Sequence, residues 1–207
     1  MKNKEIFINS TDPRIEFFDS QASHWDDDIA EIERTLRRLD ELRDLLRLHK
    51  GQDVLEVGCG TGQITGWLSS VVAPGEVVAI DFSQKMLSRA REKGIKAKFV
   101  HLDICCDKPE GVFDVALCFH SFPHFRDKES ALKNISASLK PAGSLIVLHL
   151  ASSEQINSFH KGVGDAVGED FIPARGDWDK LLSVADLELD TYIDKDDLFF
   201  LRAVKNR

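Results

Sequence analysis

Three closely spaced glycines lie in the segment Val54-Leu-Glu-Val-Gly-Cys-Gly-Thr-Gly62. Glycine lets the backbone turn tightly from a strand into a helix, and it lets a ligand approach without meeting a Cβ atom. A nicotinamide or flavin site has its third glycine one place later, where this chain has Gln63. Glu56 lies just before the turn, where a carboxylate repels a diphosphate and suits a ligand that carries an amino group.

Acidic side chains also follow the next two apolar runs. Asp81 ends the run Val77–Ile80, and Asp103 follows residues 98–102. The carboxyl ends of parallel strands meet at one edge of an open α/β sheet, and ligands bind at that edge. Asp81 alone could be no more than a helix-capping acid. Three such features after three successive strands favour one ligand site built from all of them.

Histidine is the other residue type that could do chemistry here. Of the seven histidines, His120 and His124 follow a fourth apolar run, His149 lies near the end of a fifth, and His160 comes eleven residues later. A neutral imidazole could take a proton from an acceptor hydroxyl, thiol or amine. Three imidazoles, from His124, His149 and His160, could instead hold a divalent metal ion such as Zn²⁺. Equally, His149 could be a hydrogen-bonded core residue and His160 could only cap a helix.

The four cysteines are Cys59, Cys105, Cys106 and Cys118. They contain no Cys-x-x-Cys spacing, and the adjacent Cys105 and Cys106 are poorly placed for an ordinary disulfide. This pair could bind a soft metal, but burial is the interpretation that we favour. The low cysteine content predicts a reduced, cytoplasmic protein.

Alternating strands and helices must position these residues. One long helix is predicted over residues 26–50, because an apolar stripe recurs at steps of three and four and Gly51 can end it. Strands are then predicted at 53–57, 77–80, 98–102, 112–119 and 144–150, and helices at 63–71, 83–93 and 127–139. This alternation predicts a parallel sheet that is covered by helices on both faces.

The C-terminal part of the chain has a different pattern. A helix is predicted at 178–185, followed by strands at 187–193 and 198–204. Only a few residues separate these two strands, so they are expected to pair antiparallel, since a parallel return needs a long crossover. Residues 152–177 are the least regular part of the chain.

Composition limits the classes of protein to which the chain can belong. Its 207 residues suffice for one domain. Lysine and arginine total 27 against 35 acidic residues, which gives a net charge of −8, and no basic run stands out. Such a surface repels a phosphate backbone, so we expect no nucleic-acid partner. No apolar run reaches the roughly 18 residues of a membrane span, and no apolar signal region begins the chain, so we expect neither membrane insertion nor export.

On these motifs the chain resembles the class I S-adenosylmethionine-dependent methyltransferases of the small-molecule type. Glu56–Gly62 matches the first motif of that family closely, and Asp81 matches the acid that holds the two ribose hydroxyls. Asp103-Ile104 matches the acid that accepts from the adenine amino group and the neighbour that packs on the ring. Leu139-Lys-Pro-Ala-Gly143 matches the turn before the fifth strand, although the family usually has a glycine in place of the alanine. Phe17–Trp25 resembles the N-terminal lid, in which an aromatic side chain covers the cofactor.

The resemblance implies a doubly wound α/β fold. Its sheet is seven-stranded, mostly parallel and Rossmann-like, with the strand order 3-2-1-4-5-7-6 and an antiparallel last strand. One domain would cover residues 1–207, with an N-terminal lid and helix at 1–50, a cofactor-binding core at 51–150, and an acceptor-side segment with the terminal strands at 151–207.

The resemblance also implies S-adenosylmethionine as the cofactor, with S-adenosylhomocysteine as its product. The residues implied to contact it are Trp25, Glu56, Gly58, Cys59, Gly60, Gly62, Asp81, Phe82, Met86, Asp103, Ile104 and Phe119.

The expected function is in-line transfer of a methyl group to a small-molecule acceptor. His124 and His149 are the candidate catalytic bases. The chain lacks the Asn/Asp-Pro-Pro-Tyr/Phe motif of members that methylate amines of DNA, RNA or protein, which agrees with its acidic charge. Three alternatives remain at this stage: a regulatory protein that binds the cofactor without transfer, an aminopropyltransferase, and a methyltransferase that uses a divalent metal or a metal-bearing acceptor at the histidines.

Overall fold

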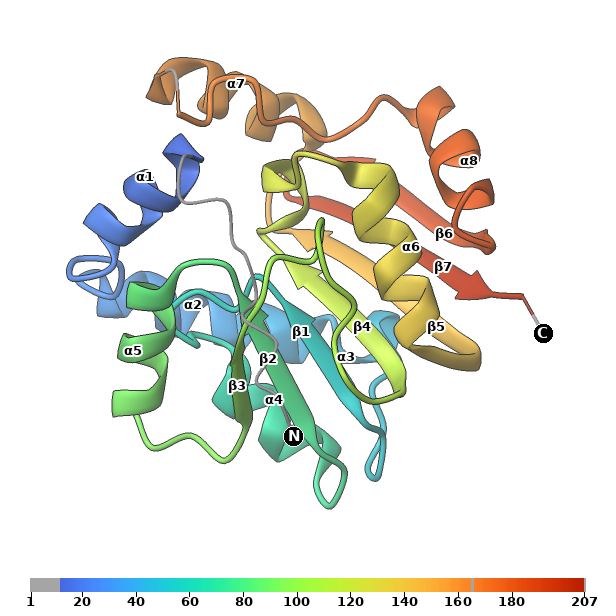
Figure 1. Ribbon diagram of the computed structural model, residues 1–207, viewed down its shortest axis with the longest axis horizontal. Coiled ribbons are helices and arrows are strands. Elements are labelled where there is room, and N and C mark those ends of the chain that lie inside the picture. The colour runs from blue at the N-terminus through green and yellow to red at the C-terminus, as the bar shows by residue number, and fades with distance from the viewer. Residues whose placement is uncertain (1–11, 165, 207) are drawn as a thin grey trace.

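The computed structural model describes residues 12–164 and 166–206. Its strands form one seven-stranded sheet in the order β3-β2-β1-β4-β5-β7-β6 (Figure 1). The strands are β1 (Val54–Val57), β2 (Val77–Asp81), β3 (Lys98–His101), β4 (Phe113–Phe119), β5 (Leu139–His149), β6 (Leu187–Lys195) and β7 (Leu198–Lys205). Strands β1 to β5 pair in parallel, whereas β7 is antiparallel to both β5 and β6. The predicted sheet, its strand order and its antiparallel last strand are confirmed.

Helices cover both faces of this sheet (Figure 1). They are α1 (Pro13–Gln21), α2 (Ile29–Glu41), α3 (Arg43–Leu46), α4 (Thr65–Val72), α5 (Gln84–Glu92), α6 (Lys128–Ser138), α7 (Ser153–Val163) and α8 (Arg175–Ser183). Leu55 of β1 shares an apolar core with α6 and α8, whereas its neighbour Val54 shares a second core with α2, α3 and α4. Because successive strand side chains point to opposite faces, the two cores lie on opposite sides of the sheet. Within the described residues, none of the helices has the length and apolar character to cross a membrane.

The single helix predicted over residues 26–50 is wrong, because the segment forms two helices, α2 and α3. The Asp28 side chain caps α2 by accepting from the Glu31 backbone N–H at 2.9 Å. Helix α2 ends before Leu42, which has φ −87° and ψ 4°. This break lets Leu39, Leu42 and Leu46 all enter the core beneath the sheet, although the apolar stripe continues across it.

The segment 152–177 is more regular than its glycines indicate, because α7 occupies its first half. Ser152 begins this helix with a capping box, in which its hydroxyl accepts from Gln155 N while the Gln155 side chain accepts from Ser152 N. This Ser-x-x-Gln spacing was present in the sequence and could have revealed the helix. The turn predicted at Pro141–Gly143 falls inside β5, where Ala142 has a φ of +61°.

The glycine turn after β1 packs directly against the segment that follows β4. Gly58 has a φ of +74°, and a Cβ atom at this position would lie 2.5 Å from Cβ of Ser121. The Ser121 hydroxyl donates to the carbonyl of Val57 at 2.6 Å. The absence of a side chain at Gly58 therefore lets the loops after β1 and β4 meet, and the functional site forms at this junction.

Gly58→Ala tests this contact against Gly94→Ala. Gly94 has a φ of +63°, but nothing lies within 4 Å of a Cβ atom built there. The left-handed backbone alone is expected to cost about 1 kcal/mol in both variants, and the collision with Ser121 about 2 kcal/mol more in Gly58→Ala. Urea denaturation should therefore give a free energy of unfolding about 2 kcal/mol lower for Gly58→Ala than for Gly94→Ala. Equal losses would contradict the close approach.

Candidate functional site

A cavity of about 830 Å³ lies at the carboxyl ends of β1, β2 and β4. All but one of the predicted cofactor contacts line it: Trp25, Glu56, Gly58, Cys59, Gly60, Asp81, Phe82, Met86, Asp103, Ile104 and Phe119. The three predicted histidines, His124, His149 and His160, line it as well. The fold therefore brings the glycine turn, the strand-end acids and the histidines to a single cavity.

Gly62 is the predicted contact that does not line the cavity. A Cβ atom at this position would lie 3.3 Å from Ala90, from Ile95 and from the Thr65 hydroxyl. With a φ of +77°, Gly62 closes the turn onto α5 and its following loop. The structure thus assigns it a place in the packing of the turn.

Two buried carboxylates, Glu56 and Asp81, face the cavity from the ends of β1 and β2. Oε2 of Glu56 accepts from the Thr65 hydroxyl at 2.6 Å. The two oxygens of Asp81 accept from the backbone N–H groups of Ser83 at 2.8 Å and Gly60 at 2.7 Å. Neither carboxyl group forms an ion pair with any described residue, so neither has a cationic partner in the described part of the chain.

Burial without a cation raises the pKa of both groups. Desolvation, with the Asp81 charge adding to it, raises the pKa of Glu56 to about 8. Desolvation raises the pKa of Asp81 to about 6, although its backbone hydrogen bonds act in the opposite direction. At neutral pH, Glu56 is therefore mostly protonated and Asp81 mostly ionised. A cationic ligand group beside Glu56 would favour loss of its proton.

The predicted N-terminal lid lies over the part of the cavity beside the glycine turn and the end of β2. It comprises α1 and the turn that carries Trp25, whose indole Nε1 would be 3.8 Å from a Cβ built at Gly60. Phe18, which sequence reasoning did not single out, is buried and places its ring 5.6 Å from that of Phe82 and 5.8 Å from that of Trp25. An aromatic cluster thus connects the lid to the end of β2.

Two polar contacts fasten the lid to the core. The Ser83 hydroxyl donates to Oδ1 of Asp19 at 2.6 Å. On the other side, Asp26 accepts from the Thr61 hydroxyl at 2.7 Å and pairs with Lys93 Nζ at 2.8 Å. Asp26 therefore ties the lid to the glycine turn, a role that the prediction of a helix starting at residue 26 had missed.

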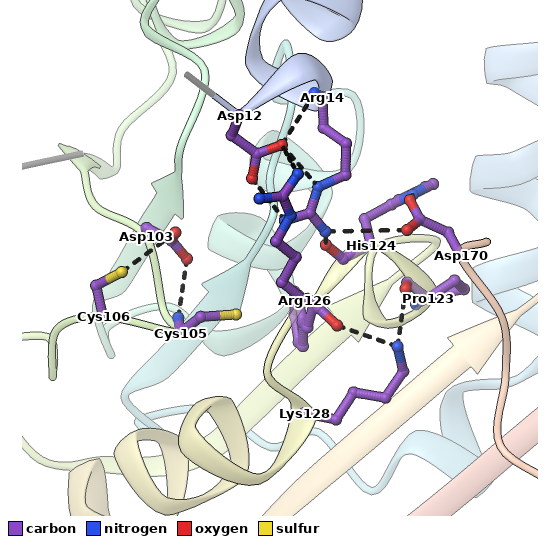
Figure 2. Close-up of polar contacts among 11 residues, drawn as sticks. Asp12, Arg14, Asp103, Cys105, Cys106, Pro123, His124, Arg126, Lys128 and Asp170 are labelled. Carbon is purple, nitrogen blue, oxygen red and sulfur yellow. Dashed lines mark hydrogen bonds and ion pairs between the residues drawn. The ribbon is translucent and has the colours of Figure 1, made fainter. Parts of the chain in front are cut away.

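Asp103 and the two adjacent cysteines form the third acidic corner of the site (Figure 2). Oδ1 of Asp103 accepts from Cys105 N at 2.9 Å, and the Cys106 thiol donates to Oδ2 at 3.5 Å. Burial of the pair was predicted; this is wrong for Cys106, which is exposed, and Cys105 is half-buried. Desolvation, together with the Asp103 charge, raises the pKa of Cys105 to about 12, so its thiol is protonated at neutral pH.

His124 belongs to a network of charges that sequence reasoning did not find (Figure 2). Its Nδ1 lies 2.6 Å from Oδ2 of Asp170. Buried Arg14 donates to the His124 carbonyl and pairs with Asp12 through Nη2 and Oδ2 at 2.7 Å. Arg126 also reaches Asp12, with 2.9 Å between Nη2 and Oδ1. No spacing signal marked Asp170, because it lies 46 residues from His124 and only the tertiary fold brings the two together.

His149 and His120 are neighbours, but His149 is buried whereas His120 is exposed. Their rings are 4.9 Å apart and nearly perpendicular. His149 is 2% exposed, and its Nε2 has no hydrogen-bond partner among the described residues. Burial lowers the pKa of His149 well below its ordinary value, so this imidazole is neutral. His120, which was noted in the sequence but not chosen as a site residue, also lines the cavity.

The metal site predicted from His124, His149 and His160 is not supported. Throughout residues 12–164 and 166–206, no three histidine, cysteine or carboxylate side chains are grouped closely enough to hold a metal ion. Nδ1 of His160 instead donates to the Asp170 carbonyl at 2.8 Å, and Nδ1 of His124 is engaged by the Asp170 carboxylate. The three rings line one cavity, and Asp170 engages two of them through Nδ1.

The pKa of Glu56 predicts how stability depends on pH. Because its folded pKa is near 8 and its ordinary value is 4.5, the folded protein holds a proton that the unfolded chain releases. The ligand-free protein should therefore lose about 1 kcal/mol of unfolding free energy between pH 7 and pH 8. Glu56→Gln should remove this loss, and Glu76→Gln, at an exposed position, should keep it. Urea denaturation at pH 7 and pH 8 measures this loss of unfolding free energy. A loss that persists in Glu56→Gln would contradict the raised pKa of Glu56.

Comparison with known proteins gives a consistent picture. A family model described as a methyltransferase domain matches residues 55–147. The ubiquinone/menaquinone biosynthesis C-methyltransferase UbiE of Ectopseudomonas mendocina is 31% identical over 141 residues, or 64% of this chain and 54% of the relative. The 27-O-demethylrifamycin SV methyltransferase of Amycolatopsis mediterranei is 27% identical over 165 residues, or 71% and 60%. The chain spans about half the length of the curated relatives it matches.

A solved structure shares the fold along nearly the whole chain. Magnesium protoporphyrin IX methyltransferase (ChlM) from Synechocystis PCC 6803 with bound SAM has a TM-score of 0.65 at 16% identity, and the match covers 96% of this chain and all of that one. The family model, the curated relatives and this fold all agree with the glycine turn and the strand-end acids. Residues 55–147 match a methyltransferase domain, and the motifs, the curated relatives and the fold together support a class I S-adenosylmethionine-dependent methyltransferase.

Proposed function

We propose that the protein transfers a methyl group from S-adenosylmethionine to a small-molecule acceptor. The observation that carries this proposal is the pair of buried carboxylates, Glu56 and Asp81, which face one cavity without a cationic partner among the described residues. A ligand with an ammonium group, a positive sulfonium and two ribose hydroxyls supplies the charge and the hydrogen-bond donors that these groups lack. The residues present therefore fit this cofactor.

Each side chain in the part of the cavity proposed to hold the cofactor has a proposed role. Glu56 faces the ammonium group, and its proton leaves as the ligand arrives. Asp81 accepts from the ribose hydroxyls while its two backbone donors hold it in place. Asp103 accepts from the adenine amino group, and buried Ile104 packs on the ring. Trp25 covers the bound molecule from the lid.

The remaining cavity supports a small acceptor. The whole cavity, which the cofactor and the acceptor would share, has a volume of about 830 Å³, within the range of small-molecule sites. The net charge of −8 disfavours a nucleic-acid acceptor. The names of the two relatives described above indicate that those proteins methylate small molecules. When bound, the cofactor supplies a methyl group already activated on sulfur, so the protein chiefly aligns the acceptor and excludes water.

His124 and His149 are the proposed catalytic groups on the acceptor side. His124 is held through Nδ1, which leaves Nε2 available as a base. His149 is neutral and has an unpartnered Nε2, so it suits a hydrogen bond to the acceptor better than it suits holding a proton.

Calorimetric titration tests the cofactor site. Asp81→Asn removes an ionised acceptor and is expected to weaken S-adenosylmethionine binding by about 10- to 100-fold, which corresponds to one or two charge-assisted hydrogen bonds. Asp44→Asn, at an exposed position in α3, is the matched control and should leave the affinity unchanged. Equal affinity in both variants, or no binding by the wild-type protein, would show that the cavity does not hold this cofactor as proposed.

Formation of S-adenosylhomocysteine with a pool of cell metabolites tests the transfer itself. The wild-type protein should form this product, and His124→Ala should lower kcat by about 10²- to 10⁴-fold while leaving cofactor affinity nearly unchanged. A protein that binds the cofactor but forms no product with any pool would instead be a regulatory binding protein.

A further inference from the structure

Asp170 contacts two of the cavity histidines at once. Its carboxylate Oδ2 lies 2.6 Å from Nδ1 of His124, and its main-chain carbonyl lies 2.8 Å from Nδ1 of His160. A carbonyl and a carboxylate can only accept hydrogen bonds, so Nδ1 carries the proton in both rings. The remaining nitrogen of a neutral imidazole, Nε2, is then a hydrogen-bond acceptor in both.

Arg14 lies beside Asp170, and Arg14 and Lys128 together hold the loop that carries His124 (Figure 2). Nη1 of Arg14 lies 3.9 Å from its Oδ1, and the same guanidinium donates to the His124 carbonyl. Arg14 is itself fixed on Asp12, with 3.1 Å between Nε and Oδ1. Nζ of Lys128 donates to the carbonyls of Pro123 and Phe125, both at 3.0 Å. Two side chains, Arg14 and Lys128, thus hold three successive carbonyls of the loop that carries His124.

The two imidazoles form a pair on the cavity wall. Their ring centroids are 4.9 Å apart, and both residues line the cavity. Neither Nε2 has a hydrogen-bond partner within the part of the chain that the structure describes. Burial lowers the pKa of His160, so this ring is neutral. With His124 in the neutral form that donates from Nδ1, the wall offers two adjacent nitrogen lone pairs.

The surroundings of this pair limit what it can bind. The ring of Phe18 is 5.0 Å from that of His124, and the ring of Phe159 is 5.9 Å from that of His160. Both Phe18 and Phe159 line the cavity, so the wall beside the histidine pair suits a flat, apolar group. Arg14, which lines the cavity, opposes a positively charged acceptor, and two lone pairs oppose an anion. A flat, neutral molecule that donates hydrogen bonds suits the aromatic rings, the cation and the two lone pairs.

We propose that Asp170 is a positioning residue that presents Nε2 of His124 and of His160 as paired acceptors, and that they recognise the hydroxyl groups of a neutral aromatic acceptor. This inference rests on the proposed methyl transfer. The hydroxyl proton passes to Nε2 of His124, which becomes an imidazolium beside the Asp170 carboxylate. The hydroxyl oxygen uses its electron pair to bond the methyl carbon, and the pair of the broken methyl–sulfur bond stays on sulfur.

Nitrogen NMR of the histidine side chains tests the positioning without any acceptor. In the wild-type protein, His124 and His160 should both show a protonated Nδ1 and an unprotonated Nε2. Asp170→Asn should disturb the state of His124 alone, because the main-chain carbonyl that holds His160 remains. Glu169→Gln, at an exposed neighbouring position, should change neither ring. A protonated Nε2 on His124 in the wild-type protein, or an unchanged His124 in Asp170→Asn, would overturn the role of Asp170.

Catechol and 1,2-dimethoxybenzene test the acceptor class, with the protein saturated by S-adenosylhomocysteine. Both molecules have the same ring, but only catechol donates hydrogen bonds. We expect catechol to bind at least tenfold more tightly and to shift the Nε2 signals of His124 and His160, as the loss of a donor at a buried acceptor predicts. Equal binding of the two probes, binding without these shifts, or no binding of either would overturn the acceptor class.

The same samples separate this inference from the proposed function. Failure of S-adenosylhomocysteine to bind in a calorimetric control would contradict the proposed function, whatever the state of the histidines. Normal binding together with the wrong histidine state would contradict the inference alone.

Discussion

The burial of two carboxylates without a cation is the constraint on which the site depends. Glu56 and Asp81 are almost fully removed from solvent, and burial raises the pKa of both. Leaving charge uncompensated in such a place destabilises the ligand-free fold, and a ligand that supplies positive charge and donors relieves that cost. The positive φ angles of the glycine turn and the lid contacts of Asp19 and Asp26 build the enclosure in which this exchange can occur.

The cavity divides into two halves with different electrostatics. Glu56, Asp81 and Asp103 line the half beside β1, β2 and β3, whereas imidazoles and aromatic rings line the half beyond β4 and β5. Gly58 lies at the junction, where its missing side chain lets Ser121 and the histidine segment approach the glycine turn. A positively charged cofactor would bind in the carboxylate-lined half, and a neutral acceptor would bind in the half lined by imidazoles. The reacting atoms would then lie near the boundary between the two halves.

The sequence predicted what local patterns and topology determine. Alternating apolar runs specified the sheet, and the helix predicted at 83–93 is α5, which Ser83 caps by accepting from Met86 N. The long helix was wrong because one apolar stripe continues across the break at Leu42. The histidine metal site failed because spacing alone does not show how each ring is hydrogen-bonded. Asp170 could not be found at all, because its contact with His124 exists only in the folded chain.

Proton release on cofactor binding tests the central claim most directly. Calorimetric titration of S-adenosylhomocysteine at pH 7, repeated in buffers with different heats of ionisation, counts the protons released per ligand bound. If the ammonium group of the ligand takes its place beside Glu56, the wild-type protein should release close to one proton and Glu56→Gln should release none. Binding with no proton release, or with equal release in the two proteins, would contradict the account.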